Sequence, residues 1–117
     1  MFEMTITTAG GEVLRRYDLS RLAGGGKRLL IGRADDCDIR IKNSAISRHH
    51  CAIEALEDDE WVVRDLGSTH GSFVNGERIS ETEISPGLTV SVGPAILRFD
   101  SVASRIAADI AKEISED

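Results

Sequence analysis

The sequence predicts an all-β fold of the sandwich type, and two observations predict it. Many short segments in the first 100 residues alternate apolar and polar side chains or form brief apolar runs, as half-buried or buried strands do. Residues typical of turns, mainly Gly, Pro, Asn and Asp, separate these segments at close and regular spacing. The 117 residues suffice for one domain with its own core.

Taken in order, the pattern predicts about ten strands. They are expected at residues 2–8, 12–19, 28–32, 38–41, 51–56, 61–66, 72–74, 77–79, 88–92 and 95–99. In the second strand we expect Val13, Leu14, Tyr17 and Leu19 to be buried. Asn75-Gly76 gives the clearest hairpin signal, because a type I′ turn needs positive φ at both central positions.

The last part of the chain has a different pattern. Between residues 101 and 117, apolar side chains recur at helical spacing, at Val102, Ile106, Ile110 and Ile114. We therefore expect a sandwich over residues 1–100 and a C-terminal amphipathic helix over 101–117, packed on or near it. A helix that binds a partner or dimerises is the alternative.

Composition argues against several classes of protein but leaves room for a small basic pocket. The net charge of −6 argues against a general binder of nucleic acid or anionic membranes, whose surface is basic. No apolar run approaches the length of a membrane span, and the first residues lack the pattern of a signal peptide. We therefore expect a cytoplasmic protein in which Cys37 and Cys51 are reduced.

Three polar loops follow or precede predicted strands and carry the chemistry. They contain Gly32-Arg33, the segment 47–50 (Ser-Arg-His-His) and the segment 68–71 (Ser-Thr-His-Gly). Loops at one end of a sandwich can converge. If these three converge, guanidinium groups, hydroxyls and backbone N–H groups form a small anion site without an evident base.

The residues do not favour an enzyme, a metal site or a cofactor. The histidines and cysteines lack the close spacing of a zinc motif, and His50 and Cys51 point to opposite faces of a strand. No nucleophile lies in a recognisable elbow. The glycines at 24–26 before Lys27 lack the remaining residues of a nucleotide-binding loop.

The order and spacing of these motifs, ending in the segment 65–76 (Asp-Leu-Gly-Ser-Thr-His-Gly-Ser-Phe-Val-Asn-Gly), resemble the forkhead-associated (FHA) domain family. The resemblance runs from about Leu30 to Gly76. It implies an eleven-stranded β-sandwich whose loops at one end bind phosphothreonine in a partner protein, a mode of recognition that uses arginine.

Individual roles carry over by position. The resemblance implies that Arg33 contacts the phosphate, that the Ser47 hydroxyl hydrogen-bonds to it, and that Thr69 supplies a phosphate or loop contact. Arg48 is expected on the phosphate or the peptide backbone. His70 stands where Asn is commoner and would hold the peptide backbone through a ring nitrogen.

The resemblance also implies structural residues beneath the loops. His50 would brace the loop that carries Ser47, and Asn75 would hold its own loop. Gly32, Gly71 and Gly76 would shape the backbone.

The expected function is a non-catalytic, phosphothreonine-dependent binding module in Ser/Thr kinase signalling. Its expected partner is a phosphorylated protein, namely a kinase or a kinase substrate, rather than nucleic acid or membrane. The alternative is a phosphate-independent scaffold or dimerisation domain with the same fold.

Overall fold

The computed structural model describes residues 2–19, 28–56 and 60–101. The predicted helix therefore lies outside the described residues, apart from Ser101, which ends a strand. The described part contains eleven strands, and none of its segments is a helix long and apolar enough to span a membrane. The strands are Phe2–Thr8 (β1), Val13–Asp18 (β2), Arg28–Gly32 (β3), Ile39–Arg40 (β4), Cys51–Ala55 (β5), Trp61–Asp65 (β6), Ser72–Val74 (β7), Glu77–Ile79 (β8), Glu81–Glu83 (β9), Thr89–Val92 (β10) and Ala95–Ser101 (β11).

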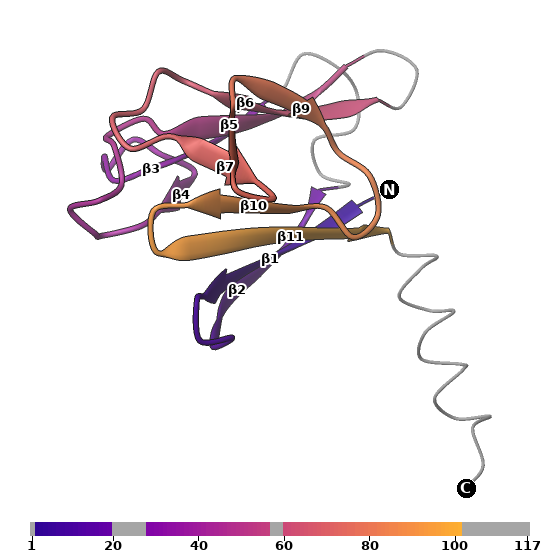
Figure 1. The fold of residues 1–117 in the computed structure, drawn as a ribbon, viewed down its shortest axis with the longest axis horizontal. Helices are drawn as coiled ribbons and strands as arrows, with labels where there is room; N and C mark the ends of the chain where they lie inside the picture. Colours follow the sequence, from indigo (N-terminus) through magenta and orange to yellow (C-terminus); the bar gives the residue numbers. More distant parts are fainter. Residues whose placement is uncertain (1, 20–27, 57–59, 102–117) are drawn as a thin grey trace, which may run out of the picture.

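The strands form two sheets that pack face to face (Figure 1). One sheet has the order β2-β1-β11-β10-β7-β8, and the other has the order β4-β3-β5-β6-β9. The assigned strand pairs are antiparallel except β3 and β4, which are parallel. The all-β sandwich predicted from the sequence is confirmed.

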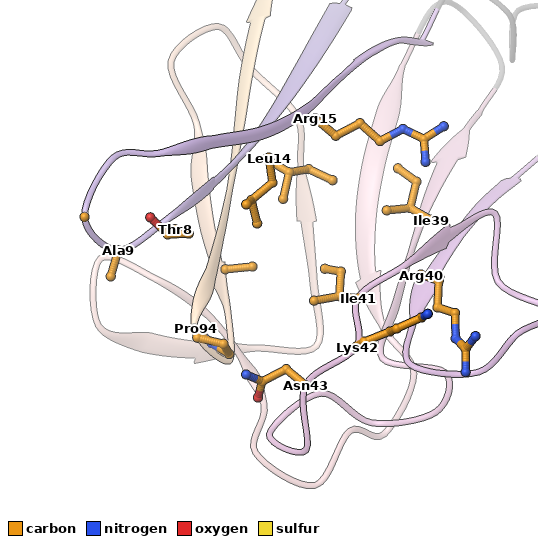
Figure 2. A pocket seen from close by; sticks show the side chains of 13 residues that line it. Thr8, Ala9, Leu14, Arg15, Ile39, Arg40, Ile41, Lys42, Asn43 and Pro94 are labelled. Atoms are coloured by element: carbon orange, nitrogen blue, oxygen red, sulfur yellow. The ribbon is translucent and has the colours of Figure 1, made fainter.

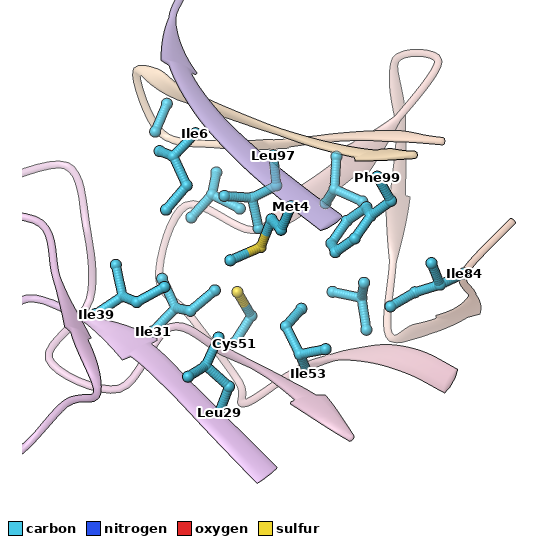
Figure 3. Close-up of a cluster of buried hydrophobic side chains, with 14 of the residues drawn as sticks. Met4, Ile6, Leu29, Ile31, Ile39, Cys51, Ile53, Ile84, Leu97 and Phe99 are labelled. Carbon is cyan, nitrogen blue, oxygen red and sulfur yellow. The ribbon is translucent and has the colours of Figure 1, made fainter. Parts of the chain in front are cut away.

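The core lies between the two sheets and follows from the alternating pattern. Met4 and Ile6 on β1 and Leu97 on β11 are buried from one side, and Ile31 and Ile53 meet them from the other (Figure 3). Burying each such side chain contributes about 1.5–3 kcal/mol relative to leaving it exposed. The period of two therefore fixes which face of each strand points inward.

The predicted burial of the second strand was only partly right. Leu19 is buried and Tyr17 half-buried, but Val13 is 48% exposed and Leu14 52% exposed. β2 is an edge strand, and its register with β1 shifts at Ile6. The edge strand of the opposite sheet, β4, has only two residues, so too little of the second sheet lies opposite to cover this end of β2.

The pattern also missed one strand, β9. Its Glu81 and Glu83 are exposed, and only Thr82 is half-buried. β9 is a strand because its backbone pairs with β6 along the edge of the second sheet. No apolar alternation marks it, since its side chains contribute little to the core.

Candidate functional site

Three loops meet at one end of the sandwich, on the left in Figure 1: residues 33–38, 41–50 and 66–71. Two backbone hydrogen bonds join the first loop to the second. The N–H of Arg33 donates to the carbonyl of Ser47, and the N–H of Ala34 donates to that of Arg48, both at 3.0 Å. The convergence expected from the sequence therefore occurs.

Gly32 makes this contact between the first two loops possible. A Cβ atom at this buried position would lie 2.2 Å from the carbonyl oxygen of Arg48 and 3.0 Å from the sulfur of Cys37. The contact with the Arg48 carbonyl excludes any side chain here unless the backbone moves. Glycine is thus required here for close approach rather than for an unusual φ angle.

The second loop is anchored below by an apolar side chain. Ile46 is 1% exposed and packs under the turn between β10 and β11. Gly93 in that turn has a φ of 56°, and a Cβ there would lie 2.8 Å from the Ile46 side chain. Burial of Ile46 therefore holds the loop that presents Ser47 against the end of the sandwich.

Ser47 joins the second loop to the third. Its hydroxyl oxygen accepts a hydrogen bond from the backbone N–H of Thr69 at 3.0 Å. Because a serine hydroxyl can accept and donate at the same time, its own hydrogen remains available for an external acceptor. Ser47 is half-buried and Thr69 is exposed, so a ligand can reach both.

His50 is fully buried beneath these loops. Its Nδ1 accepts from the backbone N–H of Ser47 at 3.1 Å, and its Nε2 lies 2.9 Å from the carbonyl oxygen of Gly71. Since Nδ1 accepts, Nε2 carries the hydrogen and donates to Gly71. The imidazole therefore ties the second loop to the third. Because it is bonded to the Ser47 backbone N–H and not to the Ser47 hydroxyl, these two residues do not form a Ser–His nucleophile pair.

Asp65, at the end of β6, organises the third loop. Its carboxylate accepts from the N–H groups of Gly67 and Ser68 at 3.0 Å and from the hydroxyls of Ser68 and Ser72 at 2.7 Å. Burial alone would raise the pKa of Asp65, but the hydrogen bonds from Ser68 and Ser72 outweigh it and hold the pKa below its ordinary value. The ionised carboxylate thus fixes the loop.

The hairpin that follows supports the same loop from the side. Asn75 and Gly76 have φ angles of 51° and 81°, as the predicted type I′ turn requires. The turn brings back Arg78, whose Nη2 donates to the carbonyl of Ser68 at 2.9 Å. Gly71 has a φ of 87°, and a Cβ there would lie 2.8 Å from the Arg78 side chain. The sequence gives Arg78 no distinguishing signal, because arginine on a hairpin strand is usually a solvated residue.

Above this framework the polar groups face solvent. Arg33, Arg48, Thr69 and His70 are exposed. Arg33 donates from Nε to the carbonyl of Ile46 at 3.0 Å, which positions the guanidinium, and neither Nη group has a hydrogen bond within the described residues. The site therefore presents guanidinium and hydroxyl donors, which are suited to binding a phosphate.

A basic hollow adjoins this site and was not foreseen. Arg33, Arg40, Lys42, Asn43 and Ser44 line a concavity of 490 Å³, hereafter the basic hollow. Arg40 donates from Nε to the carbonyl of Arg33 at 2.9 Å. The alternation of Arg40 and Lys42 in an acidic chain is the signal that could have indicated it.

Among the residues that the structure describes, one group of potential metal ligands lies nearby. The ligand atoms of Asp36, Cys37 and His49 fall within 4.8 Å of one another, whereas no metal site was expected from the sequence. Each of these groups already has a partner: His49 Nε2 lies 2.9 Å from Asp36, and the Cys37 thiol donates to the carbonyl of Arg48. The other cysteine, Cys51, is a free thiol in the core, and burial raises its pKa to about 12.

Comparison with known proteins agrees with this geometry. The FHA domain of CT664 from Chlamydia trachomatis superposes with a TM-score of 0.71 at 24% identity, covering 86% of this chain and 96% of that one. EmbR of Mycobacterium tuberculosis, solved in complex with a low-affinity phosphopeptide, superposes with a TM-score of 0.66 at 26% identity, covering 84% of this chain and 24% of EmbR.

Sequence comparison points to the same family. FhaB of Mycolicibacterium smegmatis, an FHA domain-containing protein, is 30% identical over 81 residues, which cover 68% of this chain and 52% of FhaB. The chain thus spans about half the length of that relative. The profile of the FHA domain matches residues 29–93, which include all three loops. This chain therefore belongs to the FHA domain family.

Proposed function

We propose that this chain is a non-catalytic module that binds phosphothreonine-containing proteins in Ser/Thr kinase signalling. The observation that carries the proposal is the Ser47 hydroxyl, held by Thr69 at the junction of three braced loops beside the exposed guanidinium of Arg33. Phosphorylation adds about −1.5 to −2 charge and three acceptor oxygens, which match these donors. Thr69 and Arg48 complete the phosphate contacts, and His70 holds the peptide backbone.

Family membership supports this proposal. EmbR, a relative in fold and sequence, has been solved with a phosphopeptide. In this chain the partner is a Ser/Thr kinase or one of its substrates, encountered in the cytoplasm. The phosphorylated residue is threonine rather than serine, because the γ-methyl group gains about 0.8 kcal/mol, roughly fourfold in affinity, when it is buried against the protein.

The test is a titration of matched peptide libraries that contain phosphothreonine, phosphoserine or the unphosphorylated residue. Wild-type protein should prefer phosphothreonine. Arg33→Ala should lose about 2 kcal/mol, or roughly thirtyfold in affinity, because it removes charge-assisted hydrogen bonds. Arg33→Lys, which keeps the charge but loses the fork of donors, should fall between the two.

Arg98→Ala is the matched control, since Arg98 lies on β11 of the first sheet and pairs with Asp100. It removes the same charge from the whole molecule and should bind phosphopeptide like the wild type. Equal binding to all three libraries, or binding to none, would contradict the proposal and favour a phosphate-independent scaffold.

A further inference from the structure

The basic hollow carries more positive charge than one phosphate requires. Three of its five lining residues, Arg33, Arg40 and Lys42, are cations, and no acidic residue lines it. None of the three forms an ion pair with another residue in the described ranges 2–19, 28–56 and 60–101. In a chain of net charge −6, such a local excess of unpaired cations in a concavity attracts anions.

The hollow is continuous with the proposed phosphothreonine site through Arg33. The Arg33 guanidinium is oriented by the carbonyl of Ile46, and the Arg33 carbonyl in turn accepts from Nε of Arg40. Arg40 is therefore held beside Arg33, and its Nη groups have no hydrogen bond to residues that the structure describes. Lys42 has no hydrogen bond to the described part of the chain, so its ammonium group is available as well.

The hollow also opens onto a larger apolar groove between the edge strands β2 and β4. Arg40, Lys42 and Asn43 line both, and Figure 2 shows the Arg40 and Lys42 side chains at the same end of the groove. Leu14, which is 52% exposed, lines the groove from β2. The hollow at Arg33 and the apolar groove therefore meet at Arg40, Lys42 and Asn43.

We propose that the basic hollow is a second anion subsite, which takes a further phosphate or a carboxylate from the same peptide. This inference rests on the proposed function, because it places a second negative group close to the phosphothreonine. Arg40 and Lys42 would contact that group directly, and Asn43 and Ser44 offer polar side chains beside it. The preferred partner is then a multiply phosphorylated or acidic tract rather than an isolated phosphothreonine.

The test uses synthetic peptides with one phosphothreonine in a neutral context, into which phosphothreonine or glutamate is introduced at each flanking position in turn. At one or a few positions, a second phosphate should raise affinity about tenfold at low salt. This gain lies between that expected from an exposed ion pair and that expected from a charge-assisted hydrogen bond. Glutamate, with one charge, should give a smaller gain. Added salt should reduce both gains.

Lys42→Gln is the decisive variant, because no hydrogen bond or ion pair joins the Lys42 side chain to the described ranges. It should abolish most of the gain from the second anion and leave affinity for the singly phosphorylated peptide unchanged. Arg40→Lys retains the charge but loses the hydrogen bond to Arg33, so it should keep much of the gain. Arg98→Gln removes one charge elsewhere and should leave both affinities as they are.

The singly phosphorylated peptide separates the two proposals. If it binds and the second anion adds less than about twofold at every position, or adds the same in Lys42→Gln, the second subsite is wrong and the proposed function stands. If neither peptide binds, the proposed function fails and the subsite fails with it.

Discussion

The backbone N–H of Thr69 donates to the hydroxyl of Ser47 at 3.0 Å, across 22 residues of sequence. This hydrogen bond occupies one acceptor position of the hydroxyl, which leaves the Ser47 hydroxyl able to donate to a second group. It also makes the geometry of the second loop depend on the third.

Replacement of Ser47 tests this relationship. Ser47→Ala removes both the proposed donor to phosphate and the acceptor of Thr69, so phosphopeptide affinity should fall by about 1.5–3 kcal/mol and the free energy of unfolding by about 1 kcal/mol. Calorimetric titration and urea denaturation measure the two quantities. Ser91→Ala, at an exposed position on β10, is the control and should change neither. Unaltered binding by Ser47→Ala would exclude the hydroxyl from the site.

His50 and His49 are adjacent, and their replacement should have opposite consequences. His50 is fully buried and makes two hydrogen bonds, whereas His49 has 47% of its side chain exposed and contacts Asp36. His50→Ala leaves the Ser47 N–H and the Gly71 carbonyl without partners and opens a cavity, so it should cost about 3 kcal/mol or more. His49→Ala should stay within about 0.5 kcal/mol of wild type in the same denaturation series. Similar losses in the two variants would show that the bracing role is misassigned.

Gly32 and Gly10 offer a matched pair for the close contact between loops. Gly32→Ala places a Cβ 2.2 Å from the carbonyl oxygen of Arg48, so backbone must move, and stability should fall by about 1–3 kcal/mol. At Gly10 a Cβ would meet only the Thr8 hydroxyl at 3.7 Å, an ordinary contact. Gly10→Ala should therefore be close to neutral in thermal unfolding. A Gly32→Ala protein as stable as wild type would contradict the packing described.

Asp65 should make stability depend on pH in the acid range. Its pKa in the folded protein lies below the ordinary value of 3.8, so the carboxylate contributes stability above that value and loses it as pH falls through 3.8 toward the folded pKa. Asp65→Asn should remove this part of the acid dependence and lower stability at neutral pH. Denaturation curves over the acid range measure both effects.

Asp36→Asn is the control for this series. The hydrogen bond from His49 also lowers the pKa of Asp36, but the carboxylate is exposed. Its replacement should therefore alter the acid dependence far less. If the stability of Asp65→Asn depends on acid pH as that of the wild type does, other groups cause the dependence.

The fold was largely predictable because the core depends on local alternation. The alternating apolar residues of β1 and β11 indicate which face of each strand is buried, and the Asn75-Gly76 turn is specified by two adjacent residues. The polar strand β9 was missed, since only its pairing with β6 makes it a strand. Val13 and Leu14 were misassigned because burial at a sheet edge depends on the strand opposite, which the sequence does not reveal.

The candidate site was predictable in its loops and in part of their support, since His50 and Gly32 were expected to hold the loops. Other supports were missed. The order of Arg33, Ser47 and Thr69 along the chain indicated the three loops that the structure brings together. Arg78 and Arg40 were not identified, because each acts through a carbonyl group in another segment. Such contacts leave no pattern in the local sequence.

The four hydrogen bonds that Asp65 accepts have a kinetic consequence. They hold the third loop in place before any peptide arrives, so association would not have to wait for that loop to fold. The rate of encounter should then be governed by diffusion and by attraction between opposite charges, and peptides of different sequence should differ mainly in how long they stay bound. Such a module would sample many phosphorylated chains rapidly and retain only a few.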